Sequence, residues 1–173
     1  MTEMPLKNAA ARIKRRPMPS EHDPESVLRQ FRVVFKSVRQ HFEVVERQCG
    51  VSGSQLWALA AIHSNPGMKV TELAQRMSIH QTTASNLIKL LLQKSLVERH
   101  RSLEDGRVVE LFISTAGQRI IRTAPKPLDG VLPDALGHLS PEGLNRLGNA
   151  LGELLQVMKV RVDSGGDVPL ADI

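Results

Sequence analysis

The sequence predicts a mainly helical protein that carries one small β-hairpin. Two observations lead to this class. Apolar residues recur every three or four positions over most of the chain, as they do on one face of a helix, whereas from Val97 to Ile113 the apolar period falls to two. The composition agrees, because 41% of the 173 residues are hydrophobic but only 3% are aromatic, which leaves aliphatic side chains to build the core.

The first long helix is expected from Pro24 to Gly50, after a basic arm over residues 1–23. Asp23 can cap this helix, Pro24 suits its first turn and Gly50 marks its end. The arm is expected to be a loose tail, with a DNA-contacting arm as the alternative. The apolar stripe of the helix is formed by Val27, Leu28, Phe31, Val34, Phe35, Val38, Phe42 and Val45. A small domain seldom buries so long a stripe alone, so we expect a partner chain to cover it.

Three shorter helices are expected next. One begins at a cap of Ser52 or Ser54 and ends at the turn Asn65-Pro66-Gly67. A short helix covers Val70–Met77, and a longer one runs from about Gln81 to Ser95. All three present apolar residues at helical spacing, so each is expected to bury one face.

The hairpin and the C-terminal helices complete the pattern. Strands are expected over Val97–Arg101 and Arg107–Ile113, with Asp105-Gly106 as the turn signal between them. A helix from Thr115 is interrupted by Pro125 and Pro127, and a poorer helical segment follows to His138.

The last helix opens with the cap Ser140-Pro141, and a tail that we expect to be loose begins at Asp163. The apolar stripe of this helix is Leu144, Leu147, Leu151, Leu154, Leu155 and Met158. We therefore divide the chain into a basic arm (1–23), a dimerisation helix (24–50), a winged helix-turn-helix domain (51–117), C-terminal dimerisation helices (118–162) and a tail (163–173).

The order of elements from Val70 to Ile113 carries the functional argument. A short helix that Thr71 can cap, a tight turn, a longer helix and a hairpin predict a winged helix-turn-helix, whose second helix can enter a DNA major groove. No Asp or Glu occurs from Gln81 to Leu96, as DNA binding predicts, since phosphates repel carboxylates. A merely polar surface helix is the alternative. The outward side chains are those of Gln81, Thr82, Thr83, Ser85, Asn86 and Lys89.

Cationic residues border the hairpin. Arg99 and Arg101 lead into it and Arg107 leaves it. A long cation at a hairpin tip can enter a narrow minor groove, and Asp105 can hold the guanidinium of Arg107 in place. Alternatively, Asp105-Gly106 is only a turn and Arg107 only a solvated strand end.

The run VTELAQRMSIHQTTASNLIKLLLQKSLVERHRSLEDGRVVELFISTAGQ resembles the winged helix of MarR-type regulators. With its flanking helices the resemblance covers about residues 24–160, and its most specific parts are Asp105-x-Arg107 and Leu111–Gly117. It implies that Arg107 enters the minor groove, that Asp105 orients it, that the outward residues of the helix from Gln81 read DNA, and that the terminal helices form a homodimer. His80 departs from the family's usual cap, and Asn86 stands where Arg is frequent.

The resemblance also implies release from DNA by a small aromatic or phenolic anionic effector. Cations at two positions could neutralise its carboxylate, whereas for the two histidines and the tryptophan the alternative is that they are packing residues of the core. The candidate effector residues are Lys36, Arg39, His41, Trp57 and His63.

Other classes of protein have little support in the sequence. We expect no cofactor or metal, because the histidines are scattered and Cys49 is the only cysteine. We expect no enzyme, because no Gly-rich phosphate loop or nucleophile elbow occurs. The chain lacks an apolar run of the ~18 residues that a membrane span needs and the apolar core of a secretory signal, so a cytoplasmic location is expected.

The expected function is therefore that of a homodimeric, DNA-binding transcription regulator. It is expected to be a repressor that binds a pseudo-palindromic operator and is released by a small effector. The net charge of +5 agrees with a polyanionic partner. The alternatives are a winged-helix module for protein–protein contact and a cysteine-based redox sensor that uses Cys49, although the chain has no tyrosine to assist such a thiol.

Overall fold

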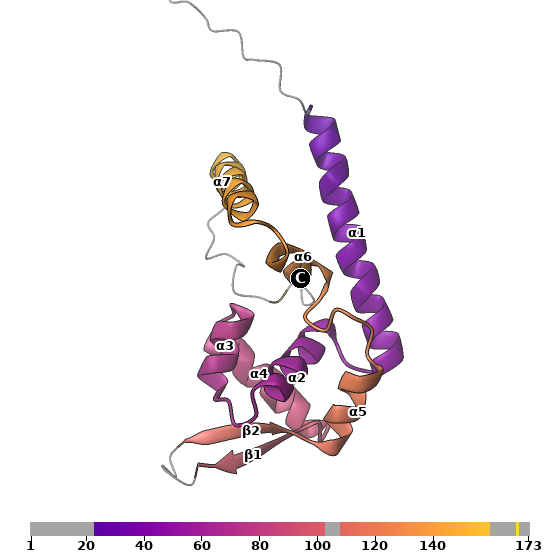
Figure 1. Ribbon diagram of the computed structural model, residues 1–173, viewed down its shortest axis with the longest axis vertical. Coiled ribbons are helices and arrows are strands. Elements are labelled where there is room, and N and C mark those ends of the chain that lie inside the picture. Colours follow the sequence, from indigo (N-terminus) through magenta and orange to yellow (C-terminus); the bar gives the residue numbers. More distant parts are fainter. Residues whose placement is uncertain (1–22, 103–107, 160–168, 170–173) are drawn as a thin grey trace, which may run out of the picture.

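The computed structural model describes residues 23–102, 108–159 and 169, which form a mostly helical structure with one two-stranded antiparallel hairpin (Figure 1). The elements are α1 (Pro24–Cys49), α2 (Gly53–Ser64), α3 (Val70–Met77), α4 (Gln81–Gln93), β1 (Val97–Arg101), β2 (Val109–Ile113), α5 (Thr115–Thr123), α6 (Val131–Gly137) and α7 (Pro141–Val157). The fold class predicted from the sequence is confirmed. None of the described helices combines the length and the apolarity that crossing a bilayer requires.

Short polar residues and one glycine set the ends of the first two helices. The Asp23 carboxylate accepts a hydrogen bond of 2.6 Å from the backbone N–H of Ser26, which caps α1. Gly50 ends α1 in the left-handed conformation, with φ at 64°. Ser52 then begins α2 in a capping box with Gln55. The sequence signals at these positions therefore correspond to real helix ends.

Two expected element ends and one expected cap differ in the structure. α3 begins at Val70 as expected, but its N-cap is Lys69 rather than Thr71, and the carboxylate of Glu72 accepts a 2.9 Å bond from the backbone N–H of Lys69. α4 ends at Gln93, because Ser95 turns into the left-handed region with φ at 55°. β2 begins at Val109 rather than Arg107, and residues 103–107 lie outside the described part.

The hairpin is tied to the helices by backbone hydrogen bonds. β1 and β2 pair with Val97 opposite Ile113 and Arg101 opposite Val109. On its other edge β2 pairs with the α2–α3 loop, since the N–H of Gly67 donates to Leu111 O at 2.9 Å and the N–H of Leu111 donates to Met68 O at 3.0 Å. The hairpin therefore projects from a fixed base.

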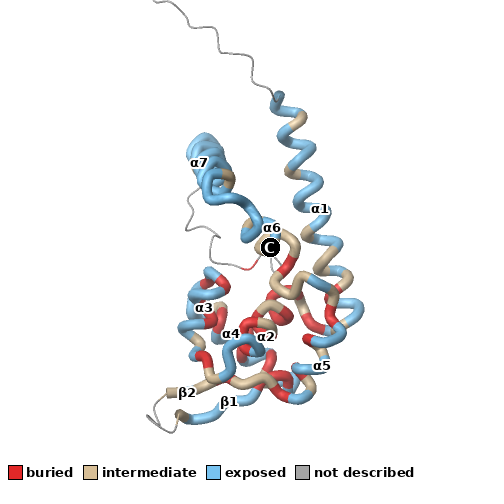
Figure 2. Tube along the Cα trace, in the orientation of Figure 1, coloured by how far each residue is buried: buried red, intermediate tan, exposed pale blue. Residues whose placement is uncertain are grey.

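The core lies among α2, α3, α4, α5 and the hairpin, a group that we call the winged-helix core (Figure 2). Its fully buried large side chains include Leu56, Leu59, Ile62, Leu73, Ile88, Leu91 and Leu111. α5 approaches this core so closely that a Cβ on Gly117 would lie 2.3 Å from Leu96 O and 2.7 Å from Ile113 Cγ1. Only glycine permits that approach.

α1 and α7 contribute little to this core. Both extend to the side of the winged-helix core away from the hairpin (Figure 1). Val45 is the only buried residue of α1, and α7 has none. Large apolar side chains are therefore uncovered on both helices, among them Phe35 at 65% exposure, Leu144 at 46% and Leu151 at 38% (Figure 2).

Candidate nucleic-acid interface

The turn between α3 and α4 gives the helix pair its geometry. Ser78 adopts a left-handed conformation with φ at 53°, and its N–H donates to Gln75 O at 3.1 Å. The N–H of Ile79 donates to Ala74 O at 3.0 Å, and the Ile79 side chain is buried. A turn with these bonds and an apolar anchor holds α3 and α4 as one rigid helix-turn-helix unit.

One face of α4 is buried and the opposite face is exposed. Ala84, Leu87, Ile88 and Leu91 face the core. Of the six residues predicted to face outward, Gln81, Thr82, Ser85, Asn86 and Lys89 are exposed, and Thr83 is half-buried at the edge of the face. The structure thus collects these polar side chains on one surface that carries no carboxylate of α4.

The N-terminal end of α4 borders an open groove. His80 is the N-cap residue, and its side chain makes no capping hydrogen bond to α4. The groove has a volume of about 420 Å³ and is lined by Thr71, Ala74, Gln75, Ser78, Ile79, His80 and Gln81. The polar residues of this mixed lining continue the exposed face of α4 toward α3.

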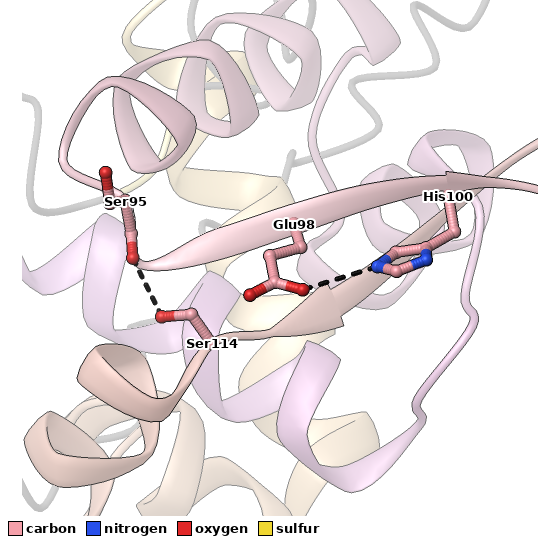
Figure 3. Close-up of polar contacts among 4 residues, drawn as sticks. All are labelled: Ser95, Glu98, His100 and Ser114. Atoms are coloured by element: carbon pink, nitrogen blue, oxygen red, sulfur yellow. Dashed lines mark hydrogen bonds and ion pairs between the residues drawn. The ribbon is translucent and has the colours of Figure 1, made fainter.

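The strand register gives the hairpin two unlike faces. Arg99 lies opposite Leu111 and Arg101 opposite Val109, so both arginines share one face. Glu98 and His100 lie on the other face, where His100 Nε2 is 3.3 Å from a Glu98 carboxylate oxygen (Figure 3). The His100 ring also meets the edge of Phe112 at a centroid distance of 5.0 Å. Sequence reasoning missed this pair, although its i, i+2 spacing in a strand was the available signal.

Ser114 fixes the base of the hairpin. Its hydroxyl donates to Ser95 O at 2.8 Å (Figure 3) and accepts from the N–H of Gly117 at 3.1 Å. The same side chain therefore caps α5 and binds the backbone of Ser95, two residues before β1. The predicted wing residues Asp105 and Arg107 lie outside the described residues, so the roles assigned to them stay predictions.

The five candidate effector residues are not brought together. Only Trp57 lines the cavity between α1, α2 and α6, alongside Val38, Phe42 and Leu132. Its volume of about 20 Å³ holds little more than one water molecule.

The other four candidates lie outside that cavity. Lys36 is exposed, and Arg39 pairs with Glu43 at 3.0 Å. His41 is half-buried with its ring against Phe42. His63 is exposed, so the alternative of a core histidine is wrong for this residue.

Cys49 is half-buried at the last position of α1, and burial raises the pKa of its thiol. A raised pKa lowers the thiolate fraction, which disfavours a peroxide-sensing role. Among the described residues, no group of three or more His, Cys, Asp and Glu side chains is arranged to hold a metal ion.

Comparison with known proteins shows which of them this chain resembles. Residues 50–108 match the model of the MarR family. The chain is 33% identical over 75 residues to the HTH-type transcriptional repressor MdtR of Bacillus subtilis (strain 168), an alignment that covers 43% of this chain and 48% of MdtR. The chain thus spans about half the length of that curated relative.

Two solved structures share the fold over most of their length. A MepR-like protein complexed with pseudoligands superposes with a TM-score of 0.54 at 18% identity, covering 78% of this chain and 95% of that one. The MepR–DNA complex of S. aureus superposes with a TM-score of 0.53 at 17% identity, covering 79% and 96%. At this level of identity the likeness establishes the fold.

Proposed function

Because residues 50–108 match the model of the MarR family and the fold is a winged helix, we propose that the chain belongs to this family and regulates transcription by binding duplex DNA as a homodimer. The observation that carries this proposal is the exposed face of α4. Apart from Leu90, it consists of short and medium polar side chains and one lysine, without a carboxylate, on a helix whose other face is anchored in the core. Such a helix fits the major groove, where base edges are distinguishable.

The side chains of α4 suggest distinct contacts. The amides of Gln81 and Asn86 can donate to and accept from an adenine edge, and the Thr82 methyl suits the methyl group of thymine. Lys89 can bind a phosphate or a guanine. Thr83 is expected to add less, because it is half-buried at the edge of the face.

The hairpin is proposed to lie along the duplex with its arginine face toward the phosphates. Arg99 and Arg101 supply cations on that face, whereas the Glu98 carboxylate on the other face would be repelled by DNA. At the tip, Arg107 is proposed to enter the minor groove and Asp105 to orient its guanidinium.

The uncovered stripes of α1 and α7 are proposed to bury each other across a two-fold axis. A symmetric dimer presents two copies of α4, which must lie about 34 Å apart to meet successive major grooves. The corresponding operator is pseudo-palindromic.

Repression with release by a small aromatic or anionic effector is the finer part of the proposal. It is supported by MdtR, which is named a repressor, and by the MepR-like protein that was solved with pseudoligands. In this chain the cavity beside Trp57 would have to open to admit an aromatic acid, since its present volume is too small. An effector would then weaken DNA binding only by its differential affinity for the open form.

The function is tested by selecting bound duplexes from a random pool and titrating their binding with salt. A DNA-binding regulator should yield a sequence with two related half-sites, and the logarithm of its affinity should fall linearly with the logarithm of salt concentration. If no duplex binds at low ionic strength, the proposal fails and the protein-interaction module becomes the better interpretation.

Arg107→Ala tests the wing in the same assay. We expect weaker binding to most duplexes, with the largest loss where the minor groove is narrow, because negative potential is concentrated there. Arg146→Ala on the exposed surface of α7 is the matched loss of one cation and should leave affinity unchanged. Equal affinities of the two variants would remove Arg107 from the interface.

A further inference from the structure

A lysine at the C-terminal end of α4 connects that helix to the end of α1. Lys94 is the C-cap residue of α4. Its ammonium group donates to the backbone oxygen of Gly50 at 2.9 Å and to the side-chain oxygen of Gln55 at 3.2 Å. Gly50 is the C-cap of α1 and Gln55 lies in the first turn of α2, so one side chain joins the ends of three helices.

Both acceptors are held by their own local structure. Gly50 is in the left-handed conformation, and its N–H donates to Glu46 O at 2.9 Å. Gln55 is buried, and its side-chain oxygen also accepts from the N–H of Ser52 at 3.4 Å in the capping box of α2. Since neither acceptor can move without disturbing a helix end, the position of Lys94 follows the position of the α1–α2 junction.

The geometry of α4 makes its C-terminal end a sensitive point. The proposed base-reading residues Gln81 to Lys89 occupy the N-terminal part of this 13-residue helix. At 1.5 Å per residue the helix is about 19 Å long, so a tilt of about 5° at its C-terminal end moves its N-terminal end by roughly 1.7 Å. That displacement is enough to break a hydrogen bond to a base edge.

We propose that Lys94 is a positioning residue that couples the orientation of α1 to that of α4 and thereby sets the half-site spacing which the dimer reads. This inference rests on the proposed function, in which α1 supplies the dimer contact and α4 reads the DNA. Lys94 itself does not contact DNA in this scheme, because its ammonium group is directed at the α1–α2 junction. Its side chain links α1, the proposed dimer helix, to α4, the proposed DNA-reading helix.

The test compares Lys94→Met with the wild type on the selected operator, on duplexes whose half-site spacing differs by one or two base pairs, and on a single half-site. Lys94→Met keeps a long apolar side chain but donates no hydrogen bond. Lys94→Arg restores a cationic donor, and Gln93→Met is the control at the neighbouring exposed position of the same helix end.

We expect Lys94→Met to lose roughly fivefold in affinity for the correctly spaced operator, at the low end of typical couplings between sites. Its affinity for misspaced duplexes and for the single half-site should change much less. The variant should therefore discriminate less than the wild type between correctly spaced and misspaced duplexes. Lys94→Arg and Gln93→Met should keep the wild-type preference. The slope of affinity against salt should stay unchanged for Lys94→Met, because no phosphate contact is lost.

Two results would overturn the inference. One is a wild-type spacing preference in Lys94→Met. The other is an equal loss on every duplex together with a salt slope reduced by about one, which is the signature of a phosphate contact. If Lys94→Met does not fold, Lys94→Gln, whose amide is too short to reach the junction, is measured on the same duplexes. If the wild-type protein binds no duplex, the proposed function itself fails. That result differs from the two above, in which the wild-type protein does bind its operator.

Discussion

At the scale of single residues, the exposed face of α4 combines groups with different hydrogen-bonding capacities. Gln81 and Asn86 each carry one donor group and one acceptor, whereas Lys89 only donates. A bidentate amide distinguishes one base pair from the other three, whereas an ammonium group is attracted to any phosphate. The amides should therefore control sequence preference and the lysine the strength of binding.

Asn86→Ala tests this division. It should reduce discrimination between the selected operator and a duplex changed at one base pair by about 1–3 kcal/mol, because a base-edge contact is lost. Competition binding with both duplexes measures the difference. Gln118→Ala, an amide removed from the exposed surface of α5, is the control, and an unaltered preference in Asn86→Ala would exclude that residue from the reading set.

Cys49 yields a prediction about pH. Because burial raises the pKa of its thiol, Cys49 stays protonated in neutral solution and should react with iodoacetamide more slowly than a small free thiol. The thiol is an acid with a raised folded-state pKa. Its contribution to stability is therefore present below the unfolded pKa and is lost as the pH rises through the folded pKa.

Mass spectrometry of alkylation against pH measures the Cys49 effect, with Cys49→Ser as the blank. Rapid alkylation at neutral pH would contradict the effect of burial and revive a redox role.

At the scale of elements, two serines each cap the N-terminus of a helix, one in buried and one in exposed surroundings. Ser114 caps α5 and Ser140 caps α7, each accepting a 3.1 Å bond from the N–H three residues on. Ser114 is buried and also donates to Ser95 O, whereas Ser140 is exposed. The Ser114 hydroxyl thus stabilises the junction of α4, β1 and α5 in addition to a helix end.

Ser114→Ala should consequently be more harmful than Ser140→Ala. Loss of a cap costs about 1 kcal/mol, and leaving the Ser95 carbonyl without its partner costs about 1–3 kcal/mol more. Urea unfolding of both variants measures the two free energies. Equal losses would show that the bond to Ser95 contributes nothing to stability.

At the scale of the whole molecule, the winged-helix core is well packed, whereas α1 and α7 leave large apolar side chains exposed. Much of the apolar stripes of α1 and α7 remains exposed, although each helix is capped and well formed. Exposed apolar area of this kind is typical of an interface with another copy.

Leu147→Glu on α7 should therefore convert the protein to a monomer, because a carboxylate would be buried without a partner at the interface. Sedimentation velocity measures the change in mass, and the same variant should lose cooperative operator binding. Asn149→Glu, at an exposed polar position of the same helix, should leave the dimer intact. A wild-type chain that sediments as a monomer would contradict the dimer.

Sequence alone determined the features that depend on neighbouring residues. The caps at Asp23, Ser52 and Ser140 and the outward face of α4 follow from side chains that act within three or four positions, so their pattern is visible in the chain. The Thr71 cap was wrong even at this range, because Lys69 is the N-cap residue of α3 and its backbone N–H donates to Glu72.

The tertiary structure alone decided what depends on distant residues. It placed Lys94 against Gly50, 44 positions earlier, and put Arg99 and Glu98 on opposite faces of the hairpin. It also separated the candidate effector residues, of which only Trp57 lines the cavity between α1, α2 and α6. Such contacts depend on how complete helices and strands pack against one another and on strand register. Neither the packing nor the register can be recognised within a short stretch of sequence.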